Sequence, residues 1–187
     1  TLMVAPGDTD VPLQARTDAA NKANADFYIS VHANALTGEW GPQEGVCTYH
    51  YPGSEKGHTA AVIIQRQLVK GTKQKDRGIL EAEFYVLKYT KMPAVLCECA
   101  FMDNLREATL LLSDAFRREC ADEIAKGTCE YFGVPYMPEQ ADEYTAALQT
   151  VAAFAGIDLD YWQNRRNIDQ YFGDLMIKIA GAVKGGK

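Results

Sequence analysis

The sequence predicts an α/β fold: a mixed, largely parallel sheet with helices on both faces, plus a C-terminal helical extension. Short apolar segments alternate with longer amphipathic segments over residues 1–135. The short segments are apolar at consecutive positions, which is typical of strands covered on both faces. Beyond them the hydrophobic spacing becomes helical throughout. We therefore expect a layered domain over residues 1–135 and a helical extension over residues 136–187.

Three segments have the composition of buried strands, and a fourth mixes turn and strand signals. The three are residues 27–32 (FYISVH), 45–53 (GVCTYHYPG) and 93–101 (PAVLCECAF), and the fourth is 76–92. Ligands gather at the carboxyl ends of strands in such sheets. His32 lies at one expected strand end, and Glu98 lies at or near another.

Helical spacing marks the segments between the strands. Residues 6–26 read as a turn and a helix that Asp10 can cap, with Leu13, Ala20 and Ala23 as a partial apolar stripe. Residues 55–71 repeat apolar side chains at intervals of three and four, and Gly71 suits the C-terminal end of that helix.

Two helical regions follow the last strand. Residues 103–133 predict a short helix and then a long one, ended by Gly133 and Pro135. Residues 140–158 and 160–187 predict two amphipathic helices, each with a broad apolar face that must pack on something.

Composition narrows the class of partner. The net charge of -6 argues against nucleic acid as the main partner, because phosphate binding requires clustered Lys and Arg. No apolar run is long enough for a membrane span. The N-terminus TLMVAPGDTD has no basic region before an apolar stretch. We therefore expect no signal peptide in this chain, and we expect the chain to begin inside a longer protein.

The cysteines are interpreted as structural thiols. The five are odd in number and none forms a C-x-x-C pair. Cys97 and Cys99 flank Glu98 in an apolar segment, so they are expected to share one face of a strand. We expect buried free thiols.

The three histidines differ in their surroundings. His58 lies early in an amphipathic helix and is interpreted as solvated or capping, and His50 is interpreted as structural. His32 ends an apolar segment and is followed by Ala-Asn-Ala, small residues that allow an ion or ligand to approach. The pattern alone leaves His32 open between a metal ligand and a hydrogen-bonded structural histidine.

Glu98 places a carboxylate inside an apolar strand. A buried carboxylate must pair with a cation, bind a metal or titrate with a raised pKa. It is therefore a candidate general base, with a structural ion pair to Lys or Arg as the alternative. Together, His32 and Glu98 fit a metal hydrolase, although catalytic zinc usually needs three protein ligands.

Four segments in this order resemble one family closely. They are DTDVPLQARTDAANKANADFYISVHANA, DRGI, FYVLKYTKMPAVLCECAFMDN and LLLSDAFRRECADEIAKGTCEYFG. Residues 1–135 are similar to the zinc-dependent N-acetylmuramoyl-L-alanine amidases, the cell-wall amidases also found among sporulation lysins and phage endolysins. The resemblance implies a six-stranded mixed sheet with helices on both faces, and Zn2+ as cofactor.

The resemblance also implies roles for individual residues. His32 matches a zinc ligand, and Glu98 matches the catalytic glutamate that activates the zinc-bound water. Phe101 and Asn104 match positions that shape the loop behind that glutamate. A further group matches positions at or beside the substrate groove, where packing and turn formation are the alternative roles: Asn34, Asp76, Arg77, Gly78 and Tyr85.

One departure from the family pattern concerns the metal. The family's other two zinc ligands come from a Gly-His-Gly turn and a following Glu, and neither occurs in this chain. We expect them upstream of Thr1, which makes residues 1–135 an N-terminally incomplete amidase catalytic domain. A metal-free descendant of the family is the second explanation.

The implied reaction is hydrolysis of the amide between N-acetylmuramic acid and L-alanine of the stem peptide. Peptidoglycan is then the partner, and the bacterial cell wall is the place of action, reached by secretion or phage release. Two alternatives remain: an amidase-like domain that binds peptidoglycan or a partner without cleaving, and a zinc hydrolase, such as a carboxypeptidase, that acts on another bond. Residues 144–182 weakly resemble a helical extension of some amidases from Gram-positive bacteria and their phages.

Overall fold

The computed structural model describes residues 1–137, so the helices predicted beyond residue 139 lie outside the described residues. The described part contains a four-stranded sheet. Its strands are β1 (Tyr28–Asn34), β2 (Val46–His50), β3 (Asp76–Glu81) and β4 (Ala94–Phe101), in the spatial order β1-β4-β2-β3. The β1–β4 and β2–β3 pairs are parallel and the β2–β4 pair is antiparallel, which confirms the prediction of a mixed, largely parallel sheet.

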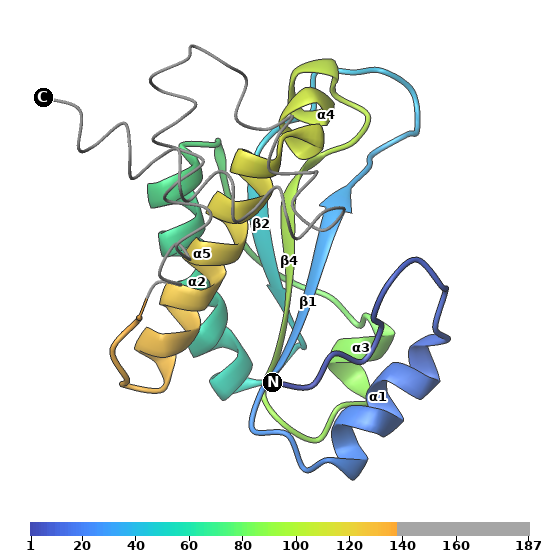
Figure 1. The fold of residues 1–187 in the computed structure, drawn as a ribbon, viewed down its shortest axis with the longest axis vertical. Helices are drawn as coiled ribbons and strands as arrows, with labels where there is room; N and C mark the ends of the chain where they lie inside the picture. Colours follow the sequence, from blue (N-terminus) through green and yellow to red (C-terminus); the bar gives the residue numbers. More distant parts are fainter. Residues whose placement is uncertain (138–187) are drawn as a thin grey trace, which may run out of the picture. The chain divides into compact units, whose positions relative to one another are not determined.

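Helices cover both faces of this sheet, as expected (Figure 1). The helices are α1 (Leu13–Lys22), α2 (Glu55–Thr72), α3 (Tyr85–Lys88), α4 (Leu105–Leu112) and α5 (Asp114–Tyr131). Helices α2 and α5 pack against one face and against each other, whereas α1 and α3 lie against the other. Within the described residues, no helix combines the length and apolar character that crossing a membrane requires.

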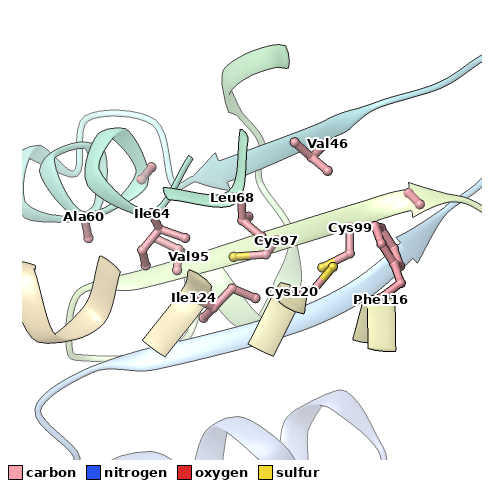
Figure 2. Close-up of a cluster of buried hydrophobic side chains, with 12 residues drawn as sticks. Val46, Ala60, Ile64, Leu68, Val95, Cys97, Cys99, Phe116, Cys120 and Ile124 are labelled. Atoms are coloured by element: carbon pink, nitrogen blue, oxygen red, sulfur yellow. The ribbon is translucent and has the colours of Figure 1, made fainter. Parts of the chain in front are cut away.

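The side chains of β4 alternate between the two faces. Val95, Cys97 and Cys99 belong to the cluster under α2 and α5, where Cys120 from α5 joins them (Figure 2). Ala94 and Leu96 belong to the cluster under α1 and α3. Because strand side chains alternate with a period of two, Glu98 lies on the α1/α3 face. The shared face of Cys97 and Cys99, and their burial as free thiols, are therefore confirmed.

The start of α1 differs from the prediction. Pro12 is the N-cap, no side chain caps the helix, and Asp10 pairs with Arg16 instead. Proline is tolerated at a helix start because it brings no N–H group that would need a partner. Of the three residues of the predicted partial stripe, Ala20 is buried, whereas Leu13 and Ala23 are exposed.

The end of α2 differs as well. The helix continues through Gly71, and Lys73 takes the left-handed conformation at its C-cap, with φ of 57°. Gly71 is instead a packing position, because a Cβ atom there would lie 2.3 Å from the side chain of Glu123 on α5. Gly71, which we expected to end the helix, instead allows α2 and α5 to approach each other closely.

The mixed segment 76–92 resolves into β3 followed by the single turn of α3. The predicted short and long helices after β4 are confirmed as α4 and α5, and Gly133 follows α5 with a positive φ of 67°.

Candidate active site

Three side chains form a row across neighbouring strands on the α1/α3 face. His32 on β1 pairs in register with Glu98 on β4, and Glu98 pairs with Cys47 on β2. Neighbouring strands lie about 4.8 Å apart, so each pair has adjacent side chains. The sheet therefore brings together the two residues that the sequence singled out.

Glu98 lies inside β4 rather than at its end, three residues before Phe101. Its Oε2 atom is buried and has no hydrogen-bond partner, and none of the ion pairs among the described residues includes Glu98. Burial raises the pKa of this carboxyl to about 7. The structure does not support the alternative of a structural ion pair, and it leaves a carboxyl that can gain and lose a proton near neutral pH.

His32 is half-buried on β1, and its Nε2 atom lies 2.7 Å from the hydroxyl Oγ of Ser30. Burial lowers the pKa of His32, and the positive charge of Arg16 on α1 lowers it further. A neutral imidazole is the form that binds metal. The other two histidines match their interpretation: His50 is buried with Nδ1 3.0 Å from the carbonyl of Tyr51, and His58 is exposed.

The donor set for a metal is incomplete in the described part of the chain. No group of three or more His, Cys, Asp and Glu side chains lies close enough there to hold a metal ion. His32 supplies one imidazole and Glu98 one carboxyl, whereas a catalytic zinc site usually has three protein ligands. The described residues alone therefore do not fit a zinc ion.

The residues predicted to contact substrate divide between the two faces. Asp76 accepts hydrogen bonds from Gln65 on α2 (2.6 Å) and from the Gly78 backbone (2.8 Å), which places it toward α2 and away from Glu98. Arg77 lies with its guanidinium carbon 4.9 Å from the Phe101 ring centroid, and it donates to the Glu44 carbonyl (3.3 Å).

Asn34 and Tyr85 reach the α1/α3 side. The Asn34 side-chain amide lies 3.9 Å from Cys47 Sγ at the end of β1. The Tyr85 ring packs on Tyr89, with ring centroids 4.4 Å apart. Their contact with substrate stays a prediction.

Sequence reasoning missed two neighbours of Glu98. Cys47 and Tyr49 on β2 face the same side as Glu98. Burial raises the pKa of Tyr49, and the smaller effects of Cys47 and Glu98 raise it further. Phe84 packs edge-on against Tyr49, with centroids 5.0 Å apart. The alternation of side chains along β2 could have placed Cys47 and Tyr49 on one face, but only the antiparallel register places that face beside Glu98.

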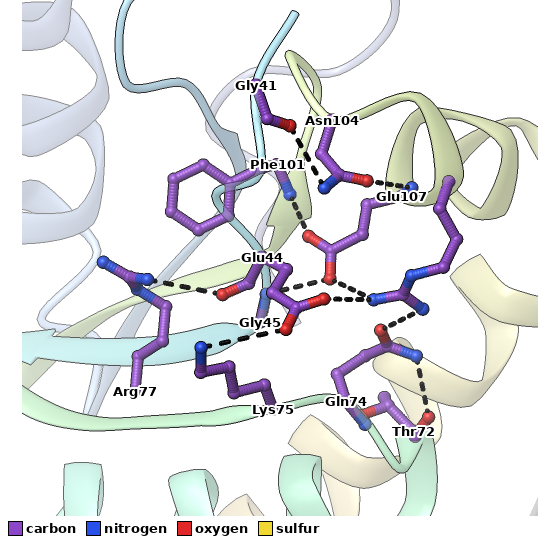
Figure 3. Close-up of polar contacts among 11 residues, drawn as sticks. Gly41, Glu44, Gly45, Thr72, Gln74, Lys75, Arg77, Phe101, Asn104 and Glu107 are labelled. Carbon is purple, nitrogen blue, oxygen red and sulfur yellow. Dashed lines mark hydrogen bonds and ion pairs between the residues drawn. The ribbon is translucent and has the colours of Figure 1, made fainter.

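A buried carboxylate fixes the ends of the strands next to this row (Figure 3). Glu107 on α4 is fully buried and accepts hydrogen bonds from the backbone N–H groups of Gly45 (2.8 Å) and Phe101 (2.8 Å). Asn104 caps α4 by accepting from the Glu107 N–H (3.0 Å), and it donates to the Gly41 carbonyl (3.4 Å). Phe101 and Asn104 thus help to hold the loop that follows β4.

Comparisons with known proteins identify the family of this chain. Residues 1–130 match the family model described as N-acetylmuramoyl-L-alanine amidase. The chain is 37% identical over 134 residues to the N-acetylmuramoyl-L-alanine amidase CwlM of Bacillus licheniformis, covering 71% of this chain and 51% of that protein. It is 37% identical over 131 residues to the endolysin of Bacillus phage SPP1, covering 66% of this chain and 47% of that protein.

A solved structure shows the same fold. The catalytic domain of CwlV, an N-acetylmuramoyl-L-alanine amidase from Bacillus (Paenibacillus) polymyxa var. colistinus, has a TM-score of 0.67 and 29% identity, covering 72% of this chain and 73% of that one. The chain spans 25% to 60% of the length of the first curated relatives that it matches. Because the family model matches residues 1–130, most of the chain, the chain belongs to the N-acetylmuramoyl-L-alanine amidase family.

Proposed function

We propose that this chain carries the catalytic glutamate of a peptidoglycan amidase, which hydrolyses the amide between N-acetylmuramic acid and L-alanine of the stem peptide. The observation that carries the proposal is the buried, unpartnered Oε2 atom of Glu98 in register beside His32. Family membership supports the reaction class. The cell wall is then the place of action.

Glu98 is suited to both proton transfers of this reaction. With a pKa raised to about 7, its carboxylate takes a proton from the attacking water as the water oxygen bonds to the carbonyl carbon. The same carboxyl then gives that proton to the L-alanine nitrogen as the C–N bond breaks. The proton count closes, and Glu98 returns to its starting state.

The described residues contain no complete set of metal ligands, so the metal is part of the proposal. Members of this family are generally metal-dependent. We propose Zn2+, with His32 as one ligand and the other ligands supplied from outside the described residues. A zinc ion held there would supply Lewis-acid chemistry, polarisation of a carbonyl and a lowered pKa for a water molecule. Ser30 orients the His32 ring through the 2.7 Å contact.

The substrate groups are proposed to lie along the α1/α3 face. Arg77 offers a cation beside Phe101, and Asn34 offers an amide at the end of β1. Tyr85 adds an aromatic wall on α3, and Gly78, where a Cβ atom would meet no atom within 4 Å, leaves β3 open to close approach. Asp76 is proposed to act indirectly, by holding the turn that carries Gly78.

The direct test is Glu98→Gln in the protein. The amide side chain is nearly the same size but cannot accept the proton, so we expect release of free L-alanine amino groups from purified cell walls to fall at least about 100-fold. Glu81→Gln, an exposed glutamate on β3, is the matched control and should keep full activity. Hydrolysis by the Glu98→Gln variant at more than half the wild-type rate would remove Glu98 from the mechanism.

The metal proposal has a separate test. We expect His32→Ala to lower the zinc content measured by elemental analysis, whereas His58→Ala, an exposed histidine on α2, should leave it unchanged. Equal zinc in the His32→Ala variant and the wild type would make His32 a structural residue.

A second candidate function follows from the incomplete donor set. A domain that binds peptidoglycan without cleaving it needs no third ligand, and fewer than three donors gather in the described part of the chain. Sedimentation with purified cell walls, without release of amino groups after zinc is added, would favour this reading.

A further inference from the structure

The loop between β1 and β2 exposes two large apolar side chains. Leu36 and Trp40 are each 68% exposed. Tryptophan is the largest apolar side chain, and leaving it in water forgoes the free energy that its burial would bring. An exposed aromatic on an ordered loop beside a candidate active site therefore suggests a binding role.

This loop is held in place by Asp103. One carboxylate oxygen, Oδ2, accepts three successive backbone N–H groups, from Leu36 (2.8 Å), Thr37 (3.0 Å) and Gly38 (3.2 Å). The carbonyl of Asp103 accepts from the Gly41 N–H at 2.9 Å.

The same carbonyl accepts from the Gln43 side chain at 2.9 Å. Hydrogen bonds therefore hold the chain on both sides of Trp40. A side chain presented by a fixed loop loses little entropy on binding, which is the general benefit of preorganisation.

The exposed surface adjoins the proposed site. Asp103 follows β4, the strand of Glu98, and the loop follows β1, the strand of His32. The Met102 N–H donates to the Asn34 carbonyl at 2.8 Å, which joins the ends of the two strands. Met102 is 51% exposed and Leu105 is 71% exposed, and both lie in the segment that anchors the loop.

We propose that Trp40 and Leu36 form a sugar-binding surface that holds the glycan strand of peptidoglycan beside the candidate active site. The proposal rests on the proposed function, and it names which part of the substrate this loop takes. A pyranose ring offers an apolar C–H face to an indole and hydroxyl and amide groups to its surroundings.

Polar side chains around Trp40 fit that chemistry. The exposed carboxylate of Glu39 stands next to Trp40 and can accept from sugar hydroxyls. The Thr37 hydroxyl bonds to the Glu39 backbone and the Gln43 side-chain N–H donates to Asp103, so these two side chains fix the loop. In intact peptidoglycan the lactyl carboxyl is part of the amide, so the sugar strand itself is uncharged and Glu39 does not repel it.

A charged partner would instead call for several charged side chains presented together. On this loop Glu44 pairs with Lys75 and Arg106. Asp103 is engaged by the loop backbone.

The test uses the neutral β-1,4-linked tetramer of N-acetylglucosamine as the probe. Trp40 and Trp162 are the two tryptophans of the chain, so Trp162→Phe leaves Trp40 as the sole indole reporter. We expect a saturable change in its emission on titration. By calorimetry on the wild-type background, Trp40→Ala should weaken binding at least tenfold, and Trp40→Phe should weaken it less.

Two further variants separate binding by the loop from general damage. Asp103→Asn keeps Trp40 but weakens the anchor of the loop, so we expect intermediate affinity with the emission of Trp40 shifted before any sugar is added. Phe132→Ala, which removes an aromatic 46% exposed directly after α5, should bind the tetramer as the wild type does. Circular dichroism melting curves check that each variant is folded.

Several outcomes would overturn the proposal. These are no saturable binding of the tetramer, or equal affinity in Trp40→Ala and the wild type. Binding of a soluble stem tripeptide but not the tetramer would assign the loop to the peptide. Dimer formation abolished by Trp40→Ala would assign it to a second copy of the chain.

The experiments distinguish failure of the sugar-binding surface from failure of the amidase reaction. Binding of the tetramer that depends on Trp40, in a protein that never releases L-alanine amino groups, supports the sugar surface and rejects the amidase. Release of amino groups that depends on Glu98, without tetramer binding, keeps the amidase and rejects the sugar surface.

Discussion

The two faces of β4 carry side chains with opposite tasks, although they alternate along one strand. On the α2/α5 face, Cys97 and Cys99 are buried among apolar side chains. On the α1/α3 face, Glu98 has an oxygen that is buried and unpartnered. The first face stabilises the fold through burial, and the second bears a desolvated acid that costs stability.

This difference explains why a single strand can be nearly all apolar and still carry the site. The α2/α5 face needs only volume and shape, and thiols satisfy both. The other face needs an acid whose pKa is displaced toward neutrality, and apolar neighbours such as Leu96 supply the desolvation that displaces it. The apolar character of β4 therefore serves packing on one side and proton chemistry on the other.

The largest stability effect is expected on the packing face. Leu68 on α2 is fully buried in the cluster with Val95 and Cys97. Leu68→Ala should lower the free energy of unfolding by about 2–5 kcal/mol, measured by urea denaturation, because it leaves a cavity. Val62→Ala on the same helix, where the side chain is 41% exposed, should cost less than about 1 kcal/mol. Equal costs at the two positions would contradict the packing assigned to α2.

A smaller effect of opposite sign is expected at Glu98. Its folded pKa of about 7 exceeds the ordinary 4.5, so ionisation destabilises the fold progressively as pH rises from 4.5 through 7. Glu98→Gln removes that cost and should raise stability at pH 8 by about 1 kcal/mol, a value reduced for partial solvent screening.

Melting curves at pH 8 and pH 4.5, with a chelator present, provide the measurement. The gain should disappear at pH 4.5, where Glu98 is protonated in the folded state. A gain of the same size at both pH values would mean that the variant acts through packing instead.

The smallest effect is expected at the surface. Asp10 is 94% exposed and pairs with Arg16 at 3.1 Å. Because exposed ion pairs contribute little, Asp10→Ala should change the free energy of unfolding by less than about 0.5 kcal/mol. A loss near 1 kcal/mol in urea denaturation would restore Asp10 as a helix cap, since that is the usual cost of removing one.

The difference between prediction and structure is informative at particular residues. The strands around His32 and Glu98 were predictable because their apolar segments are short and bounded by turn residues. Gly71 was misassigned because a glycine at a helix end and a glycine at a close helix contact look alike in sequence. Asp76 matches a position beside the groove, and Gln65, eleven positions earlier in the chain, holds its carboxylate on the α2 side, so that its role toward substrate stays a prediction.

By itself, the sequence determined the element order, the α/β class, and His32 and Glu98 as the candidate site residues. The element order and the class follow from local periodicity, and Glu98 follows from the cost of a carboxylate among apolar side chains; all of these depend on near neighbours in the chain. His32 was open on the local pattern, and only the order of motifs that resembles the amidase family singled it out as a ligand. Only the tertiary structure decided that β4 lies between β1 and β2, so that His32, Glu98 and Cys47 share one row. Strand order and register depend on pairing between distant segments, and no local pattern encodes them.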